Sequence, residues 1–340
     1  MGSTPGHPAP MPPDPAGASA LPAFGPADDA EFGLSNIERK GPGSLWAGGR
    51  FRLGERFIEA LLLLAGSSSI VITLGIVGIL LYEASTFFEH VSVIDFLTDT
   101  QWTPLFEDAH YGILPLLGGT LLTTLVGLVV AIPVGTICAI WLSEYAPKKL
   151  REIIKPALEL LGAVPTVVYG YFAYLFVTPF LQKFMPDLPG FNMLSAGLVI
   201  GLMIVPYISS LSEDAMHAVP MHMREGSYAM GATRMQTALR VIVPSSLSGI
   251  TAAYILGVSR AVGETMVVAI AAGTQPNLTA DPTEPGATIT AFIVQVSLGD
   301  LPHGSIGYQS IFAAGLMLML LTLAFNVAGF FLRRRYRQAY

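Results

Sequence analysis

Residues 213–244 read EDAMHAVPMHMREGSYAMGATRMQTALRVIVP, a polar stretch between two long apolar segments, 193–211 and 247–272. A stretch of this length between two membrane spans must lie in water or against a partner protein. Pro220 fits the first turn of a helix, where its missing N–H costs nothing. Gly231 fits the left-handed turn that ends a helix. The sequence therefore predicts a short helix that runs from Pro220 to just before Gly231.

A second short helix is predicted to follow the first. Thr233 and Gln236 have the T-x-x-Q spacing of a capping box, in which each side chain bonds to the backbone N–H of the other residue. This helix would run towards Val241, and Pro244 would end it before the next apolar segment. An ordinary pair of surface helices is the alternative interpretation of the whole stretch.

The same stretch resembles the EAA loop of ABC importer permeases. That motif consists of Glu-Ala-Ala, three residues, Gly, nine residues and Ile-x-Leu-Pro. This sequence has Glu225-Gly226-Ser227, then Gly231, then Val241-Ile242-Val243-Pro244, so both spacings hold. The resemblance implies that 213–246 is a coupling loop whose helix docks into a cleft on an ATPase subunit. The residues expected to shape or contact that interface are Arg224, Glu225, Gly226, Ser227, Gly231, Ala232, Thr233 and Pro244.

The composition is that of a polytopic membrane protein. Of the 340 residues, 52% are hydrophobic and 12% are charged, whereas soluble globular proteins carry about 25% charged residues. Proline inside a span, such as Pro165 or Pro206, is tolerated in membrane helices. We therefore predict an all-α fold with six transmembrane helices of about twenty apolar residues each. The expected spans are 57–81, 113–142, 153–181, 193–211, 247–272 and 309–332.

The positions of the basic residues predict the orientation. Segments 82–112 and 273–308 contain neither Lys nor Arg, so both are expected outside the cell, and 82–112 forms a long outer loop. Both termini and the coupling loop are then cytoplasmic, in a multi-pass protein of the inner (plasma) membrane of a bacterium. Basic residues cluster on the predicted inner side at Arg50, Arg52, Arg56, Lys148, Lys149, Arg151, Lys155, Arg224, Arg234, Arg240, Arg333, Arg334, Arg335 and Arg337.

The two ends of the permease domain differ in character. Residues 1–50 are rich in Pro, Gly and Ala and are expected to form a disordered cytoplasmic tail, because they cannot bury enough apolar surface to fold. The permease domain would then occupy 51–340. The outer loop 82–112 is acidic and rich in aromatic residues, which is typical of an interfacial helix or a docking surface for an external partner. Three scattered histidines, His90, His110 and His303, are not expected to bind a metal.

The fifth apolar segment contains two charges, Arg260 and Glu264, in the run SRAVGETM. Charges inside a membrane cost about 2.5–3.5 kcal/mol each on translocon scales and usually mark a pathway. On a continuous helix residues four apart share a face, so the two charges are expected to neutralise each other. An oxyanion would compete for the guanidinium, whose planar donors match a phosphate edge. Ser259 and Thr265 add hydroxyl donors, and Glu264 would accept the P–OH that phosphate has and sulfate lacks. The alternative is an ion pair that only fixes helix packing.

Six segments, in order, resemble the PstC-type permeases of bacterial phosphate ABC importers. The resemblance implies the type I ABC importer architecture, with a second homologous permease subunit, two cytoplasmic ATPase subunits and an extracytoplasmic phosphate-binding protein. It also implies that Arg260 and Glu264 serve phosphate movement, because an Arg and a Glu of the same motif do so in that family. The segments are QWTP (101–104), YGILPLLGGTLLTT (111–124), WLSEYAP (141–147), VPTVVYGYFA (164–173), IVPYISSLSEDA (204–215) and SRAVGETM (259–266).

Two other functions fit the same residues. One is the same architecture importing another oxyanion, such as sulfate, molybdate or tungstate, and the other is a membrane scaffold or sensor that does not transport. The sequence contains no G-x-x-x-x-G-K-[ST] phosphate loop. The chain is therefore expected not to be an enzyme by itself and to hold no cofactor or metal, with ATP and Mg²⁺ bound by the partner ATPase. Membrane lipid is an expected partner, and nucleic acid is not.

Overall fold

The computed structural model describes residues 2, 49–106, 108–299 and 301–335. The tail predicted for 1–50 lies almost wholly outside the described residues. The chain divides into two units, 1–71 and 72–340. In the first unit, the described residues from 49 onward belong to helix α1 (Gly49–His90), which continues into the second unit.

The described part of the second unit is built from helices, and an isolated bridge between Trp102 and Tyr111 is its single β-type contact. The predicted all-α fold is therefore confirmed. Three short π-helical turns interrupt or extend the α-helices and are labelled η3, η4 and η5. The elements after α1 are α2 (Val93–Thr98), α3 (Leu114–Ile140), η3 (Trp141–Tyr145), α4 (Lys148–Gly162), α5 (Thr166–Phe172), η4 (Ala173–Val177), α6 (Thr178–Gln182), α7 (Met193–His217), α8 (Met221–Ala229), α9 (Arg234–Thr237), η5 (Ala238–Ile242), α10 (Val243–Ser245), α11 (Leu247–Val262), α12 (Met266–Ala271), α13 (Ile289–Ser297) and α14 (Ile306–Arg335).

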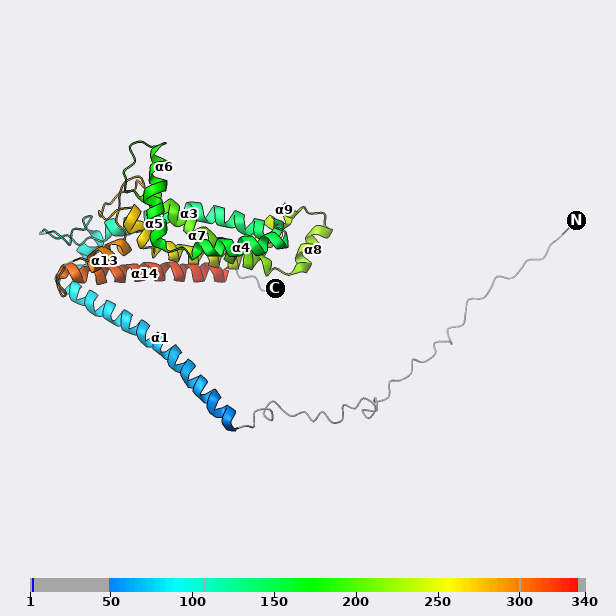
Figure 1. The fold of residues 1–340 in the computed structure, drawn as a ribbon, viewed down its shortest axis with the longest axis horizontal. Helices are drawn as coiled ribbons and strands as arrows, with labels where there is room; N and C mark the ends of the chain where they lie inside the picture. Colours follow the sequence, from blue (N-terminus) through cyan, green and yellow to red (C-terminus); the bar gives the residue numbers. More distant parts are fainter. Residues whose placement is uncertain (1, 3–48, 107, 300, 336–340) are drawn as a thin grey trace. The chain divides into compact units, whose positions relative to one another are not determined.

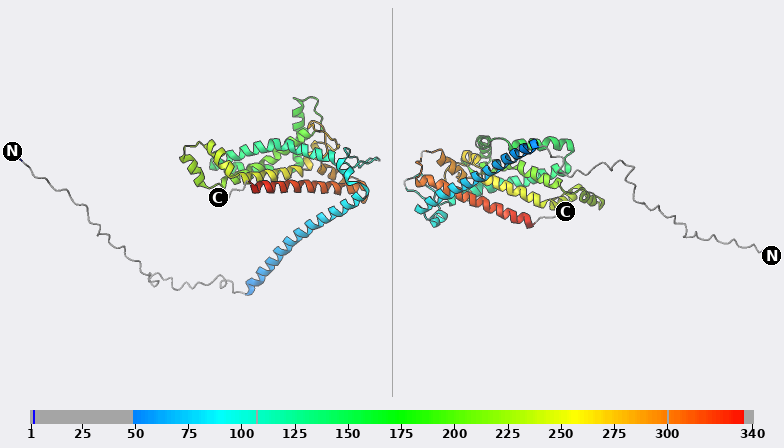
Figure 2. Two further views of the ribbon diagram at one scale, coloured as in Figure 1. Left: turned by 180° about the vertical axis from the view of Figure 1, so that it is seen from behind. Right: turned by 90° about the horizontal axis from the view of Figure 1, so that it is seen from below.

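Helices α3, α7 and α14 run lengthwise through the second unit (Figure 1), and α11 packs against both α7 and α14. Helices α8 and α9 lie at one end of this bundle, which we call the coupling end. Helix α13 and the segment between α1 and α3 lie at the opposite end, which we call the far end (Figure 1). The views from behind and from below show the same arrangement (Figure 2). The two segments without Lys or Arg therefore meet at the end opposite the coupling loop.

Glycines bring α3 and α7 into close contact. A Cβ atom on Gly201 would lie 2.6 Å from the carbonyl oxygen of Gly127, and one on Gly197 would lie 2.6 Å from Val126 Cγ1. The Gly197-x-x-x-Gly201 pattern thus marks a real close approach of two helices, as small residues do in membrane proteins. This contact fixes α7 as the central helix on which α4, α11 and α12 also pack.

Among the residues that the structure describes, four helical stretches are long and apolar enough to cross a membrane, at 55–90, 114–145, 193–217 and 306–335. The number rises to six if each of two bent helix pairs is counted as one span. The first bent pair corrects the predicted span 153–181, because α4 and α5–α6 meet at 85°. Pro165 lies in the break between them. Its missing N–H leaves the carbonyl of Leu161 without an i+4 partner, and its ring disfavours helical geometry at Val164. Pro165 therefore ends a helix here and is not tolerated within one.

The predicted fifth span, 247–272, is also not a continuous helix. Helix α11 ends at Val262, with Gly263 as its C-cap, and α12 begins at Met266. At 1.5 Å per residue the 16 residues of α11 extend about 24 Å, less than the ~30 Å hydrocarbon core. The helix that precedes α11 runs from Arg234 to Ser245 and meets it at 73°.

The segment 273–308, predicted as an outer loop, contains a helix and enters the bundle. Helix α13 is capped by Thr288, whose side chain accepts from Ala291 N. The backbone N–H of Ile289 donates to Thr120 Oγ1 of α3 at 3.1 Å, and Thr290 Oγ1 donates to the carbonyl of Glu264 at 2.7 Å. This segment therefore lies against α3 and against the break between α11 and α12.

Candidate functional site

Arg260 lies in the last turn of α11 and faces α7. Its guanidinium carbon lies over the ring of Tyr207, 4.6 Å from the ring centroid. Nε of Arg260 is buried and has no hydrogen-bond partner. Among the described residues, none accepts a hydrogen bond from Arg260 or forms an ion pair with it. A stacked guanidinium uses its face and keeps its N–H donors at the edge, so the edge remains available to an oxyanion.

Glu264 does not pair with Arg260, which corrects the expected ion pair. Because α11 ends at Val262, the two residues do not share the face of one helix. Glu264 is 7% exposed, and its carboxylate accepts the backbone N–H groups of Met266 at 3.2 Å and Val267 at 3.3 Å. These are the first donors of α12, where a negative charge is favoured by the helix dipole. Glu264 therefore holds the start of α12.

The two predicted hydroxyl donors do not join Arg260 in one cluster. Ser259 Oγ donates to Asn326 Oδ1 of α14 at 3.2 Å, so it points away from Tyr207 and α7. Thr265 Oγ1 donates to the carbonyl of Gly263 at 3.3 Å within the break. The structure thus places Thr265 beside Glu264 and connects Ser259 to a different helix.

The coupling loop has the two predicted helices. Helix α8 follows Pro220, and Gly231 has a φ of +82°. The capping box of Thr233 and Gln236 is present in full. The second helix ends before the next apolar segment, as predicted, but it continues one residue past Pro244, to Ser245, before it meets α11 at 73°. The π-helical turn η5 before Pro244 changes the hydrogen-bond register, so the helix accommodates a residue that has no N–H.

Arg224 is turned inward and is held by two contacts within the chain. Its Nη1 atom lies 2.5 Å from Glu144 Oε1, and Nη2 donates to the carbonyl of Met216 at 2.7 Å. The Arg224 side chain is 11% exposed and that of Glu144 4%, so this pair fastens α8 to η3, the turn that follows α3. Glu225 and Gly226 are exposed on the outside of α8. Large apolar side chains are exposed beside them, namely Met221, Tyr228, Met230, Met235 and Leu239.

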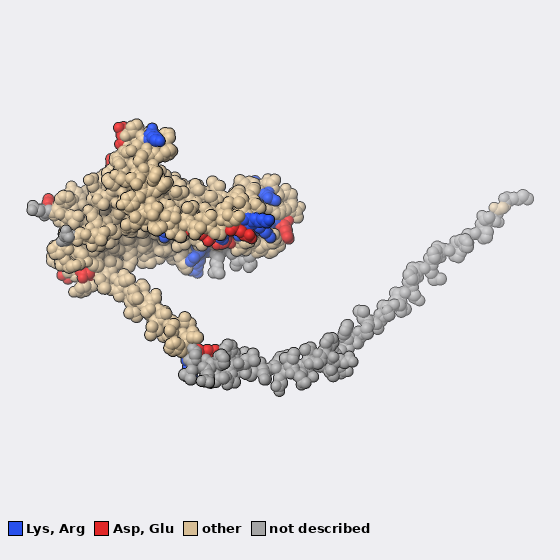
Figure 3. Space-filling model, viewed as in Figure 1, with Lys and Arg blue, Asp and Glu red and all other residues tan. Residues whose placement is uncertain are grey.

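A group of charged side chains joins α4 to α7 near the coupling end. Glu213 of α7 is fully buried, and Lys155 Nζ lies 2.8 Å from its Oε2 atom. Arg151 pairs with the same carboxylate, and Lys155 also pairs with Asp214. Figure 3 shows Lys and Arg gathered with Asp and Glu toward this end on the visible face. Helix α4 is thereby held along α7 up to its bend.

The segment 82–112 folds onto the far end. Phe87, Phe96 and Trp102 are buried and pack edge to face with each other or with Tyr111 and Phe292. His110 Nδ1 lies 2.9 Å from Asp99 Oδ2, and this hydrogen bond lowers the pKa of Asp99. No group of three or more His, Cys, Asp or Glu residues that could hold a metal is found where the structure places side chains.

The family model for the "Binding-protein-dependent transport system inner membrane component" matches residues 131–338. The chain belongs to this family. It is the permease component of an ABC importer and not the subunit that performs catalysis, and it is a multi-pass protein of the inner membrane. The matched region contains both the coupling loop and Arg260.

Individual relatives agree with the family. The chain is 35% identical over 266 residues to the "Probable ABC transporter permease protein YqgH" of Bacillus subtilis, covering 78% of this chain and 84% of that protein. It is 31% identical over 293 residues to the "Phosphate transport system permease protein PstC" of Mesorhizobium japonicum, covering 79% and 88%. It is 33% identical over 273 residues to PstC 1 of Mycobacterium tuberculosis, covering 69% and 80%. The predicted resemblance to PstC-type permeases is confirmed.

A solved structure shares the fold. It is the bacterial alginate ABC transporter in complex with its alginate pentasaccharide-bound periplasmic protein. The match has a TM-score of 0.60 at 16% identity and covers 84% of this chain and 96% of that chain. The helical arrangement is therefore that of an ABC importer permease.

Three residues of this region were not predicted from the sequence. Tyr207 stacks on Arg260, Asn326 accepts from Ser259, and Glu213 joins α4 to α7. Asn326 carries a polar amide within a largely apolar span, which is a usable signal. Tyr207 follows Pro206 in an apolar run and gives no such signal, because an aromatic residue there fits ordinary packing equally well.

Proposed function

We propose that this chain is the transmembrane permease subunit of an ATP-driven importer of inorganic phosphate and forms half of the translocation pathway. The observation that carries the proposal is the unpartnered guanidinium edge of Arg260, beside the break between α11 and α12. A planar fork of N–H donors in a low-dielectric site suits a phosphate oxyanion. The names of the PstC relatives support phosphate as the substrate.

Glu264, Ser259 and Thr265 complete the proposed pathway set. Glu264 is placed beside Arg260 in the chain, and one of its carboxylate oxygens already caps α12. The remaining acceptor capacity of the carboxylate suits the P–OH of phosphate, which sulfate lacks. In this proposal Arg260 binds the anion, and Glu264 favours the protonated form of phosphate over fully ionised oxyanions.

In this proposal, the coupling loop links transport to ATP hydrolysis by the partner subunits. Its exposed apolar residues and the outward faces of Glu225 and Gly226 support docking on a cytoplasmic ATPase subunit. Ser227, Ala232 and Thr233 shape the loop, and Ser227 Oγ lies 2.9 Å from Thr237 Oγ1. The proposed complex contains a second homologous permease, two ATPase subunits that bind ATP and Mg²⁺, and an extracytoplasmic phosphate-binding protein. This chain needs no cofactor of its own in that complex.

The test is uptake of labelled phosphate, with and without excess sulfate, normalised to membrane-inserted protein. Arg260→Ala should insert normally and lose phosphate uptake. Arg260→Lys should also transport poorly, because an ammonium lacks the planar fork. Wild-type uptake by Arg260→Ala would end the pathway proposal. Strong inhibition of the unchanged protein by sulfate, molybdate or tungstate would show that another oxyanion is the substrate.

A further inference from the structure

Tyr207 connects Arg260 to the bend between α4 and α5. One side of this connection is the guanidinium of Arg260, which lies over the Tyr207 ring at 4.6 Å. The other is the Tyr207 hydroxyl, which donates to the carbonyl of Gly162 at 3.0 Å. Gly162 is the last residue of α4. A single side chain of α7 thus contacts both the candidate anion-binding group and a backbone bend of 85°.

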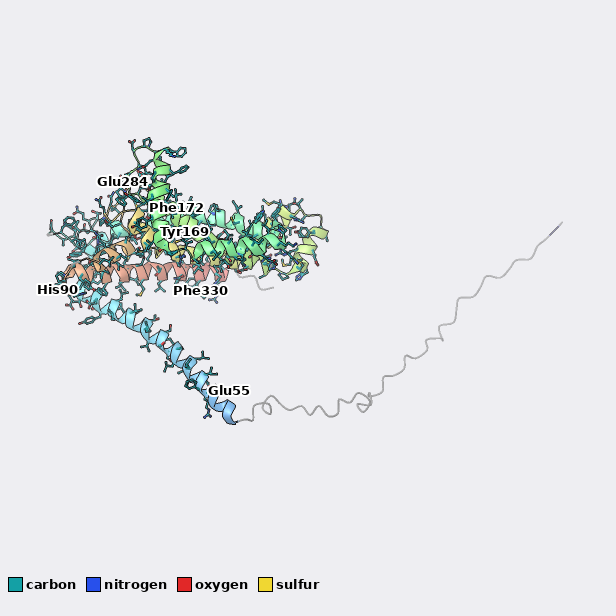
Figure 4. The ribbon with its side chains drawn as sticks, in the orientation of Figure 1. Glu55, His90, Tyr169, Phe172, Glu284 and Phe330 are labelled. Carbon is teal, nitrogen blue, oxygen red and sulfur yellow. The ribbon has the colours of Figure 1, made fainter. Side chains whose placement is uncertain are left out.

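The sequence at the bend leaves two backbone carbonyls without their usual helical donors. The carbonyl of Leu161 would bond to residue 165 in a continuous helix, but Pro165 has no N–H. The chain turns away after Gly162, so the carbonyl of Gly162 also lacks its usual helical partner. Tyrosine hydroxyls replace these donors, since Tyr169 donates to Leu161 at 2.7 Å and Tyr207 to Gly162. Figure 4 labels Tyr169 on α5, nearer to the bend than Phe172.

The contact of Tyr207 with Gly162 is close on the ring as well. A Cβ atom on Gly162 would lie 3.3 Å from the ring atoms Cε2 and Cζ of Tyr207 and 3.4 Å from its hydroxyl oxygen. A residue larger than glycine would push against the ring that carries Arg260. The ring is therefore held from one side by the end of α4 and supports the guanidinium on its face.

We propose that Tyr207 is a positioning residue for Arg260, which orients the donor edge of the guanidinium towards the pathway and ties that orientation to the bend after α4. This inference rests on the proposed function, because it takes Arg260 as the group that receives the anion. Helix α4 is fastened to α7 by Lys155 and Glu213, and Ser210 Oγ donates to Glu159 Oε1 at 3.0 Å. The position of α4 along α7 therefore sets where the carbonyl of Gly162 holds the ring.

The experiment uses proteoliposomes that contain the whole complex, supplied with saturating phosphate-loaded binding protein. Phosphate imported and ATP hydrolysed are measured together. Tyr207→Leu should lower phosphate imported per ATP by roughly three- to thirty-fold, the factor equivalent to a lost cation–π contact. Tyr207→Phe keeps the ring against Arg260 but loses the hydroxyl bond to Gly162, so its ratio of phosphate to ATP should fall between those of the unchanged protein and Tyr207→Leu. Tyr207→Met is the replacement variant if Tyr207→Leu does not insert.

Tyr169→Leu is the matched control, because Tyr169 also bonds to the bend but does not contact Arg260. A purely structural role of an aromatic residue at this bend would lower uptake and ATP hydrolysis in proportion, as expected for Tyr169→Leu. An unchanged ratio of phosphate to ATP in Tyr207→Leu, alongside lost uptake in Arg260→Ala, would overturn the inference and leave the proposed function standing. Normal uptake in Arg260→Ala would instead overturn the proposed function.

Discussion

At the scale of single residues, Glu264 combines a structural task with a candidate chemical one. Its carboxylate accepts two backbone N–H groups at the start of α12, and its backbone carbonyl accepts from Thr290 in the first turn of α13. A capping carboxylate is worth about 1 kcal/mol relative to alanine. A substitution that keeps this cap is therefore needed to reveal any role in recognising phosphate.

Glu264→Gln is that substitution, because its amide oxygen still accepts the N–H groups of Met266 and Val267 while the charge is lost. If Glu264 recognises the proton of phosphate, this variant should insert normally and lose its preference for phosphate over sulfate. The measurement is labelled phosphate uptake in the presence of increasing sulfate. Glu264→Ala is the control, which removes the cap and should lower membrane abundance. An unchanged preference in Glu264→Gln would leave Glu264 with the capping role alone.

At the scale of elements, the coupling loop depends on the turn between α8 and α9. Gly231 has a φ of +82°, and a Cβ atom added there would meet nothing within 4 Å. The cost of replacing it is therefore conformational and not steric against neighbours. Asparagine adopts the left-handed region readily, whereas β-branched residues rarely do.

Gly231→Val should strain this turn by about 1–3 kcal/mol and displace the helices that face the ATPase. Uptake and ATP-driven coupling should fall while the protein still inserts. Gly231→Asn should stay close to the unchanged protein. Both variants are compared by phosphate uptake and by ATP hydrolysis of the purified complex. Normal coupling in Gly231→Val would remove the main support for the coupling-loop assignment.

A second prediction at this scale concerns the contact of α4 with α7. Glu213→Gln leaves Arg151 and Lys155 without their buried partner. It should cost up to about 3 kcal/mol of folding stability, the low end for a broken buried pair, because the two cations remain about a quarter exposed. Asp214→Asn is the matched control, since the Asp214 side chain is 56% exposed and such pairs contribute about 1 kcal/mol or less. Thermal unfolding of the detergent-purified protein compares them, and equal shifts would contradict the assigned importance of Glu213.

At the scale of the whole molecule, the bundle has two chemically different ends. The coupling loop and its basic residues lie at one end, and the segments 82–112 and 273–308, which lack Lys and Arg, lie at the other (Figure 1). The positive-inside rule predicts that the coupling end lies in the cytoplasm, where the proposed ATPase partner would bind.

Cysteine labelling tests this orientation in a Cys138→Ala background. The Asp108 side chain at the far end is fully exposed, and Met230 at the coupling end is 88% exposed. A thiol reagent that does not cross membranes should label Asp108→Cys in spheroplasts, whose inner membrane is intact. Met230→Cys should react only after the membrane is broken. Reversed labelling would overturn the orientation and, with it, the proposed docking of the ATPase.

The sequence by itself determined the features that depend on neighbouring residues in the chain. These are the apolar segments, the caps of the coupling loop, the left-handed turn at Gly231, and the motif spacing that indicates the family. Each follows from local backbone geometry or from the cost of burying polar groups in lipid. These features can therefore be predicted without knowing the tertiary packing.

The tertiary structure decided which breaks and contacts occur inside the bundle. Pro165 lies in the break between α4 and α5–α6, which meet at 85°, whereas Pro244 lies inside the helix that ends at Ser245 and meets α11 at 73°. At the first of these bends, the hydroxyls of Tyr169 and Tyr207 donate to the carbonyls of Leu161 and Gly162. In the same way, Arg260 stacks on Tyr207 and does not pair with Glu264, whose carboxylate accepts backbone N–H groups at the start of α12. Such breaks and contacts depend on residues that are distant in the chain, so the spacing of residues in the sequence does not predict them.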